Sequence, residues 1–176
     1  MKVLALDIGY AATGAAVMER GDSGAWGVAH LRCVRPAPPS KEQKRRTYVA
    51  CMDAERMKMA AAELAGIIVE HGINRMVVEI PNSGAMGATS LRCMSYAGGM
   101  VAGLAGVTGA AVEWYLPHET RKAATGKSAC TKAEVIAAIA LVFPEVLDVP
   151  TLIDREACAD ALATFLAAKA GNLVRL

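Results

Sequence analysis

MKVLALDIGYAATGAAVMER, residues 1–20, holds two short apolar runs separated by a turn, and this stretch decides the fold. VLALDI (3–8) is typical of a buried strand, and AAVMER (15–20) is typical of a second one. The intervening GYAATG (9–14) carries two glycines and predicts a turn. WGVAHLRCV (26–34) repeats the strand pattern after a second tight turn. We therefore predict a meander of three antiparallel strands.

The remainder of the chain alternates helical and strand patterns. A Pro-rich break over 35–40 precedes apolar residues at helical spacing from Lys41 to about His71, which predicts one rod roughly 45 Å long. Ser40 is placed to cap this helix and Gly72 to end it. The later elements are predicted as strand, helix, strand, helix and helix at 75–81, about 88–106, 111–116, 131–142 and 155–170. This order predicts an α/β domain with a mixed sheet flanked by helices.

Composition limits the classes of protein that fit. The chain has 176 residues, which we interpret as one domain over 1–176. Its 19 basic and 17 acidic residues nearly cancel, which excludes a polybasic tail but permits a local basic patch. The five Cys show no metal-binding spacing and predict a reducing, cytoplasmic compartment. Residues 93–112 are uncharged but contain five glycines, so we interpret them as a packed helix and strand and expect no membrane partner.

Four carboxylates occupy positions that suit metal-dependent chemistry. Asp7 and Glu79 stand near the ends of apolar strands, where an unpaired charge is costly to bury. Glu156 and Asp160 are four residues apart on the last predicted helix and therefore share one face. Each alone is compatible with an ordinary surface or ion-pair role. Together they offer the oxygen ligands that a hard divalent cation needs, and two such ions can promote phosphodiester hydrolysis.

The chain resembles the RuvC-type Holliday-junction resolvases in several segments that follow the family order. LALDIGYAATGAAVME (4–19) resembles the family's first strand and Gly-bearing turn, and VVEIP (77–81) the strand with its second acidic residue. The helix ATSLRCMSYAGGMVAG (88–103) and the segment VEWYLPHETRKAATGKSACTKAEV (112–135) are similar to the parts that follow. ACADALA (157–163) resembles the final acidic helix. Residues of about 20–75 match poorly, which suggests a phage or mobile-element branch.

The resemblance implies a ribonuclease H-like fold with a five-stranded mixed sheet, a homodimer, and a two-ion Mg²⁺ or Mn²⁺ site. The implied activity is hydrolytic nicking of four-way junctions or related branched DNA. Asp7, Glu79 and Asp160 occupy the positions of the family's metal-binding, catalytic acids. The family usually has Asp or His three residues before the last acid, where this chain has Ala157, so we expect Glu156 to reach the site instead.

Basic residues gather in two segments that we expect to contact DNA phosphates. Lys132 matches the family's helix-leading lysine, which implies a catalytic role in neutralising charge at the scissile phosphate. After Glu79, Ser83 and Met86 are expected to contact DNA, with Met86 as an apolar wedge where related proteins can carry an aromatic residue. The remaining predicted DNA contacts are Lys41, Lys44, Arg45, Arg46, Arg121, Lys122 and Lys127, the last beside a loop (Gly126, Ser128) expected to offer backbone amides.

Two other functions remain open at this point. A junction-binding protein without nuclease activity is the alternative if Glu156 fails to complete the metal site. Actin-like sugar kinases and chaperone ATPases also open on a strand with an Asp-x-Gly turn, but they need two such domains around a cleft. A chain of 176 residues has room for one domain, which disfavours that alternative.

Overall fold

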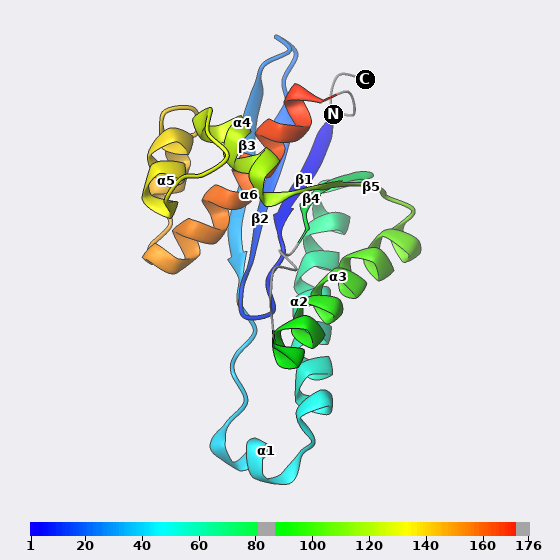
Figure 1. Cartoon of the computed structure of the whole chain (residues 1–176). Helices are drawn as coiled ribbons and strands as arrows, with labels where there is room; N and C mark the ends of the chain where they lie inside the picture. The colour runs from blue at the N-terminus through cyan, green and yellow to red at the C-terminus, as the bar shows by residue number, and fades with distance from the viewer. Residues whose placement is uncertain (81–86, 172–176) are drawn as a thin grey trace.

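The computed structural model describes residues 1–80 and 87–171, and in it a five-stranded sheet lies between two layers of helices (Figure 1). The strand order is β3-β2-β1-β4-β5. The strands are β1 (Lys2–Asp7), β2 (Thr13–Arg20), β3 (Trp26–Val34), β4 (Arg75–Glu79) and β5 (Ala111–Tyr115). β1, β2 and β3 pair antiparallel, whereas β4 pairs parallel with both β1 and β5. The predicted antiparallel meander and mixed sheet are therefore confirmed.

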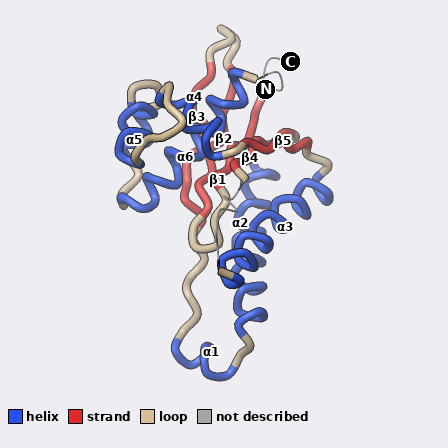
Figure 2. The backbone as a smooth tube through the Cα atoms, viewed as in Figure 1, coloured by secondary structure: helices blue, strands red, loops and turns tan. Residues whose placement is uncertain are grey.

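The helices cover both faces of the sheet (Figures 1 and 2). One face packs against the last helix through a core that includes Phe165 and Leu162, and the other packs against the long helix through a core that includes Leu64. The helical elements are α1 (Lys41–Arg46), α2 (Val49–His71), α3 (Ala88–Thr108), α4 (Pro117–Thr125), α5 (Lys132–Ala140), the 3₁₀ helix η1 (Pro144–Asp148) and α6 (Leu152–Ala170).

The predicted single rod from Lys41 to His71 is wrong, because the chain breaks into α1 and α2. Thr47 and Tyr48 both have extended backbone at the break. No residue of α1 is buried, so packing does not compensate for the weak helix propensity of the β-branched and aromatic residues there. The predicted ends are confirmed: Ser40 caps α1, and Gly72 ends α2 in the left-handed conformation.

Other boundaries differ from the predictions where caps determine them. α6 begins at Leu152, three residues earlier than predicted, because the Thr151 hydroxyl accepts a hydrogen bond from the backbone N–H of Asp154. α4 and η1 were not predicted, although Pro117 at the first turn of α4 is a recognised start signal. In the described part of the chain, no helix is long and apolar enough to cross a membrane.

Candidate active site

Two acidic side chains lie side by side at the carboxyl edge of the sheet. Asp7 is the last residue of β1 and Glu79 the last residue of β4, and the parallel pairing of these strands places the two residues in register. Both strands are fully buried over their apolar centres, which fixes where the two ends emerge. The strand pattern that predicted these positions therefore brings the two carboxylates together.

Asp160 reaches the same edge from α6, because α6 lies unusually close to β2. Gly14 pairs with Asp7 across β1 and β2, and a Cβ at Gly14 would lie 1.9 Å from the carbonyl oxygen of Ala157. Only glycine allows this approach of two backbones. Asp160 follows Ala157 by three residues, and its charge acts on both Asp7 and Glu79. A third predicted site residue thus joins the cluster.

The surroundings of Asp7, Glu79 and Asp160 raise the pKa of all three carboxyl groups. Burial is the main cause that raises the pKa of Asp7 well above its usual value, and the charges of Asp160 and Glu79 add to it. Burial likewise raises the pKa of Glu79, and it raises the pKa of Asp160 to about 6. A group of carboxylates in this state is stabilised by nearby positive charge.

Two cations lie close enough to act on this cluster. Lys132, the first residue of α5, lowers the pKa of both Asp7 and Asp160. Arg121 in α4 lowers the pKa of Glu79 and of Asp160. The sequence predicted Arg121 as a DNA contact only, and the structure adds that it stands beside the acids. A basic rim around an acidic centre is suited to holding a phosphate group there.

Glu79 is held by a contact that sequence reasoning missed. The hydroxyl of Thr120, which is 1% exposed, donates a hydrogen bond to Oε2 of Glu79 at 2.5 Å. This bond favours the charged carboxylate and opposes the effect of burial on the pKa of Glu79. Thr120 lies in the first turns of α4, so an unpredicted helix supplies it, and only the start signal at Pro117 indicated that helix.

Glu156 and Lys132 form an ion pair at the margin of the cluster. Nζ of Lys132 donates a hydrogen bond to Oε2 of Glu156 at 2.5 Å. This hydrogen bond is the largest cause of the raised pKa of Lys132. The charge of Glu156 also raises the pKa of Asp160, so its carboxylate is near that of Asp160. The expected role of Glu156 as a metal ligand stays a prediction, and its contact with Lys132 is the observed one.

The four acids offer the type of ligand atom that a hard divalent cation prefers. Asp7, Glu79, Asp160 and Glu156 all offer carboxylate oxygens, the donors that Mg²⁺ and Mn²⁺ prefer. Within residues 1–80 and 87–171, however, no three Asp, Glu, His or Cys side chains are grouped closely enough to hold a metal ion as they stand. Hydrogen bonds turn Glu79 toward Thr120 and Glu156 toward Lys132. Ligation therefore requires the carboxylates to move closer together, and the bond from Thr120 can persist because it engages only Oε2 of Glu79.

The predicted DNA-contacting residues occupy two places on the molecule. Arg121 and Lys122 lie on α4, Lys127 follows it and Lys132 begins α5, and all four are exposed. Of these, Arg121 and Lys132 are the two whose charge acts on the acids. Lys41, Lys44, Arg45 and Arg46 are exposed on α1, which projects beyond the sheet (Figures 1 and 2). Ser83 and Met86 lie outside the described residues. The backbone amide of Gly126, which was expected to bind a phosphate, instead donates a hydrogen bond to the carbonyl of Lys122 and caps α4.

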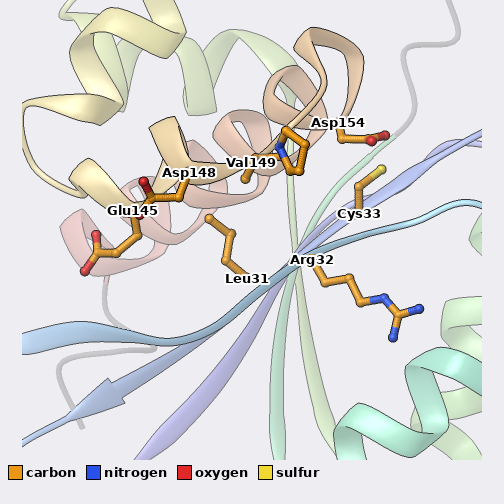
Figure 3. Close-up of a pocket in the computed structure, with 8 residues that line it drawn as sticks. Leu31, Arg32, Cys33, Glu145, Asp148, Val149 and Asp154 are labelled. Atoms are coloured by element: carbon orange, nitrogen blue, oxygen red, sulfur yellow. The ribbon is translucent and has the colours of Figure 1, made fainter.

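A separate cavity of about 310 Å³ lies between β3, η1 and the start of α6 (Figure 3). Arg32, Cys33, Asp148 and Asp154 contribute to its wall, and burial is the main cause that raises the pKa of the Cys33 thiol to about 11. None of the four acids lines this cavity, so we assign it no part in the site described above.

Comparison with solved structures defines the class of fold that carries this acidic cluster: it is the ribonuclease H-like fold in the form found in RuvC-type resolvases. The chain is similar to Thermus thermophilus RuvC in complex with a Holliday junction substrate, with a TM-score of 0.69 and 20% identity over 95% of this chain and 92% of that one. Another Thermus thermophilus RuvC structure gives a TM-score of 0.68 and 21% identity over 97% of both chains.

A eukaryotic resolvase shares the same fold. The yeast mitochondrial Holliday junction resolvase Ydc2 gives a TM-score of 0.64 and 11% identity over 96% of this chain and 78% of that one. No protein-family profile matches the sequence, and no curated protein sequence matches it either. The expected ribonuclease H-like fold is thus confirmed.

Proposed function

We propose that this protein is a divalent-metal-dependent DNA endonuclease that nicks four-way junctions or related branched DNA. The observation that carries the proposal is the convergence of Asp7, Glu79 and Asp160 at one edge of a RuvC-like fold. Lys132 and Arg121 add positive charge beside them. The structural neighbour solved with a Holliday junction substrate supports junction DNA as the substrate class.

Each residue has a distinct part in the proposed reaction. Asp7, Glu79 and Asp160 would hold the metal, which when bound supplies a Lewis acid and a nucleophile at neutral pH. Lys132 and Arg121 bind the scissile phosphate and stabilise the charge that develops on it. Thr120 orients Glu79 through its hydrogen bond, and Glu156 orients Lys132 through its ion pair. Lys122 and Lys127 contact the flanking phosphates.

Cleavage of a synthetic four-way junction tests the proposal directly. We expect nicking with Mg²⁺ or Mn²⁺, none with a linear duplex of the same sequence, and loss of nicking in Asp7→Asn. Asp22→Asn, an exposed acid in the turn between β2 and β3, is the matched control and retains activity. Junction binding without cleavage contradicts the nuclease and supports the binding-protein alternative. ATP hydrolysis without any DNA cleavage supports the kinase-like alternative.

We also propose that the enzyme acts as a homodimer. α2 and α3 frame an apolar groove of about 490 Å³, along which Gly99 and Gly103 stand one turn apart. Met57, Met100, Leu104 and Val107 also line the groove. Small residues at this spacing permit close helix packing, and an uncovered apolar groove favours a subunit contact. Two active sites related by a two-fold axis suit a junction with a similar symmetry.

The Gly103→Glu variant tests dimerisation without disturbing the fold of the subunit. A Cβ at Gly103 meets nothing within 4 Å, so the subunit itself accommodates a side chain there. We expect the wild type to sediment as a dimer and Gly103→Glu as a folded monomer with an unchanged circular dichroism spectrum. Gly66→Glu, also with open space around its Cβ, is the control and keeps the dimer. A wild-type monomer at the concentrations of the cleavage assay contradicts this part of the proposal.

A further inference from the structure

Residues 35–48 form a projection that we call the basic arm. It consists of an extended segment, the helix α1 and the two extended residues Thr47 and Tyr48. All of α1 is exposed, so this helix contributes nothing to the apolar core, and Pro36 at the base is the buried residue of the arm. A short helix without packing gains little stability for the protein. The arm therefore calls for an explanation in terms of what it contacts.

The arm leaves the sheet on the same side as the candidate active site. β3 runs in the direction of β1, because both pair antiparallel with β2. Gly14 of β2 pairs with Asp7 on one side and with Cys33 on the other, so the carboxyl end of β3 lies in line with Asp7. In Figure 1 the arm extends from this edge, well past the turn between β1 and β2.

The surface chemistry of the arm combines cations with one exposed ring. The helix α1 carries four cations, Lys41, Lys44, Arg45 and Arg46, and one acid, Glu42. The carboxylate of Glu42 pairs with Arg46 at 3.1 Å. Tyr48 lies two residues after this helix, and its side chain is 85% exposed, the most of any Phe, Trp or Tyr among the described residues. Cations that track a phosphate backbone, beside an aromatic face on which a base stacks, are the combination that binds unpaired nucleic acid.

The base of the arm is fixed to the body of the protein. Arg35 forms an ion pair with Asp154 at the start of α6. Arg56 of α2 donates a hydrogen bond to the carbonyl of Pro36 at 3.2 Å, and its guanidinium lies 4.4 Å from the centre of the Tyr10 ring. Tyr10 follows Asp7 by three residues. The arm is therefore anchored to the elements that carry the acids, and the prolines at 36, 38 and 39 stiffen it.

We propose that the basic arm is a branch-point reader: Tyr48 stacks on a base left unpaired at the branch, while the cations of α1 hold the adjoining phosphates. The inference rests on the proposed function and adds the element that distinguishes branched DNA from linear duplex. Phosphate contacts alone carry little structural selectivity, because every duplex offers them. A stacking residue acts only where a base is free to leave its neighbours.

Binding measurements in EDTA test the proposal without cleavage. Fluorescence anisotropy would give the affinity of the full chain for a four-way junction and for a linear duplex of the same sequence. We expect Tyr48→Ala to weaken junction binding about tenfold and linear binding by less than about twofold, in line with the loss of one stacked base. Tyr48→Phe keeps the ring and the affinity. Lys44→Ala weakens the binding of both DNAs.

Val69→Ala is the matched control, because Val69 is 78% exposed at the far end of α2. Val69→Ala should change the affinity for neither the junction nor the linear duplex. Neither Val69→Ala nor Tyr48→Ala should change the melting temperature. A 2-aminopurine base at the branch point gives a second readout: wild type and Tyr48→Phe change its fluorescence, and Tyr48→Ala does not. Equal effects of Tyr48→Ala on junction and duplex, or no effect on either, overturn the inference, as does a change in oligomeric state. If the wild type shows no preference for junctions at all, the proposed function itself fails.

Discussion

The hydroxyl of Tyr10 donates a hydrogen bond to Oδ1 of Asp53 at 2.5 Å, which joins the turn after β1 to the N-terminal part of α2. Asp53 is 4% exposed, and its Oδ2 accepts a second hydrogen bond at 2.9 Å from Nε of Arg92 in α3. One buried carboxylate thus connects three elements around the candidate active site. No sequence pattern predicted this contact, because its partners are 43 and 39 residues away.

We expect Asp53→Ala to lower the free energy of unfolding by about 1.5–3 kcal/mol, since it removes two hydrogen bonds to a buried charge. Urea denaturation followed by circular dichroism measures this change. Glu55→Ala, which removes only an exposed pair with Lys58, is the control and should change stability by less than about 0.5 kcal/mol. Equal losses in the two variants would contradict a structural role for the buried carboxylate.

The contact between Gly14 and Ala157 gives a second prediction. A Cβ at position 14 would meet backbone atoms of α6 at 1.9 and 2.4 Å, so Gly14→Ala must displace the helix. We expect a stability loss of about 1–3 kcal/mol or more, together with loss of junction cleavage as Asp160 moves away from Asp7. Gly66→Ala has open space in the interior of α2 and should instead stabilise the protein by about 0.5–1 kcal/mol. Cleavage at the wild-type rate by Gly14→Ala would show that the close approach is dispensable.

Thr120 provides a test of how Glu79 is oriented. Thr120→Val keeps the shape of the side chain but removes the donor to Glu79, and we expect the cleavage rate to fall about tenfold with metal-free junction affinity unchanged. Single-turnover assays over a range of Mn²⁺ concentrations measure both the rate and the metal requirement. Thr120→Ser restores the donor and should restore the rate. If Ser and Val variants behave alike, the hydroxyl has no positioning role.

Variants of Lys132 and Glu156 can show whether Glu156 holds the lysine in place or binds the metal. We expect Lys132→Ala to slow cleavage at least about tenfold, because charge at the phosphate is no longer stabilised. Glu156→Gln should slow it less, and in a Lys132→Ala background should have little further effect if Glu156 acts by holding the lysine. Independent effects with a higher metal requirement would instead identify Glu156 as the fourth ligand.

The strands and the acids at their ends could be predicted because both depend on local patterns. Apolar runs mark β1 and β4, and the carboxylate that ends each run is visible in the sequence at Asp7 and Glu79. The break at Tyr48 was missed because the polar run 41–46 was joined to the apolar periodicity that begins only at Val49, although a run without an apolar face has no burial to hold it in the same helix. Thr120 and Arg121 escaped notice as parts of the site because their proximity to the acids depends on how α4 folds back after β5.

The basic arm enters and leaves the body of the protein between β3 and α2, and α1 shares no buried residue with either core. Changes confined to the exposed side chains of α1 therefore leave every strand, the acids at the strand ends and both cores in place. Selection can recharge such a helix without disturbing the residues around Asp7. Under the proposed function, the preference among DNA structures and the metal-dependent chemistry are then free to evolve at different rates.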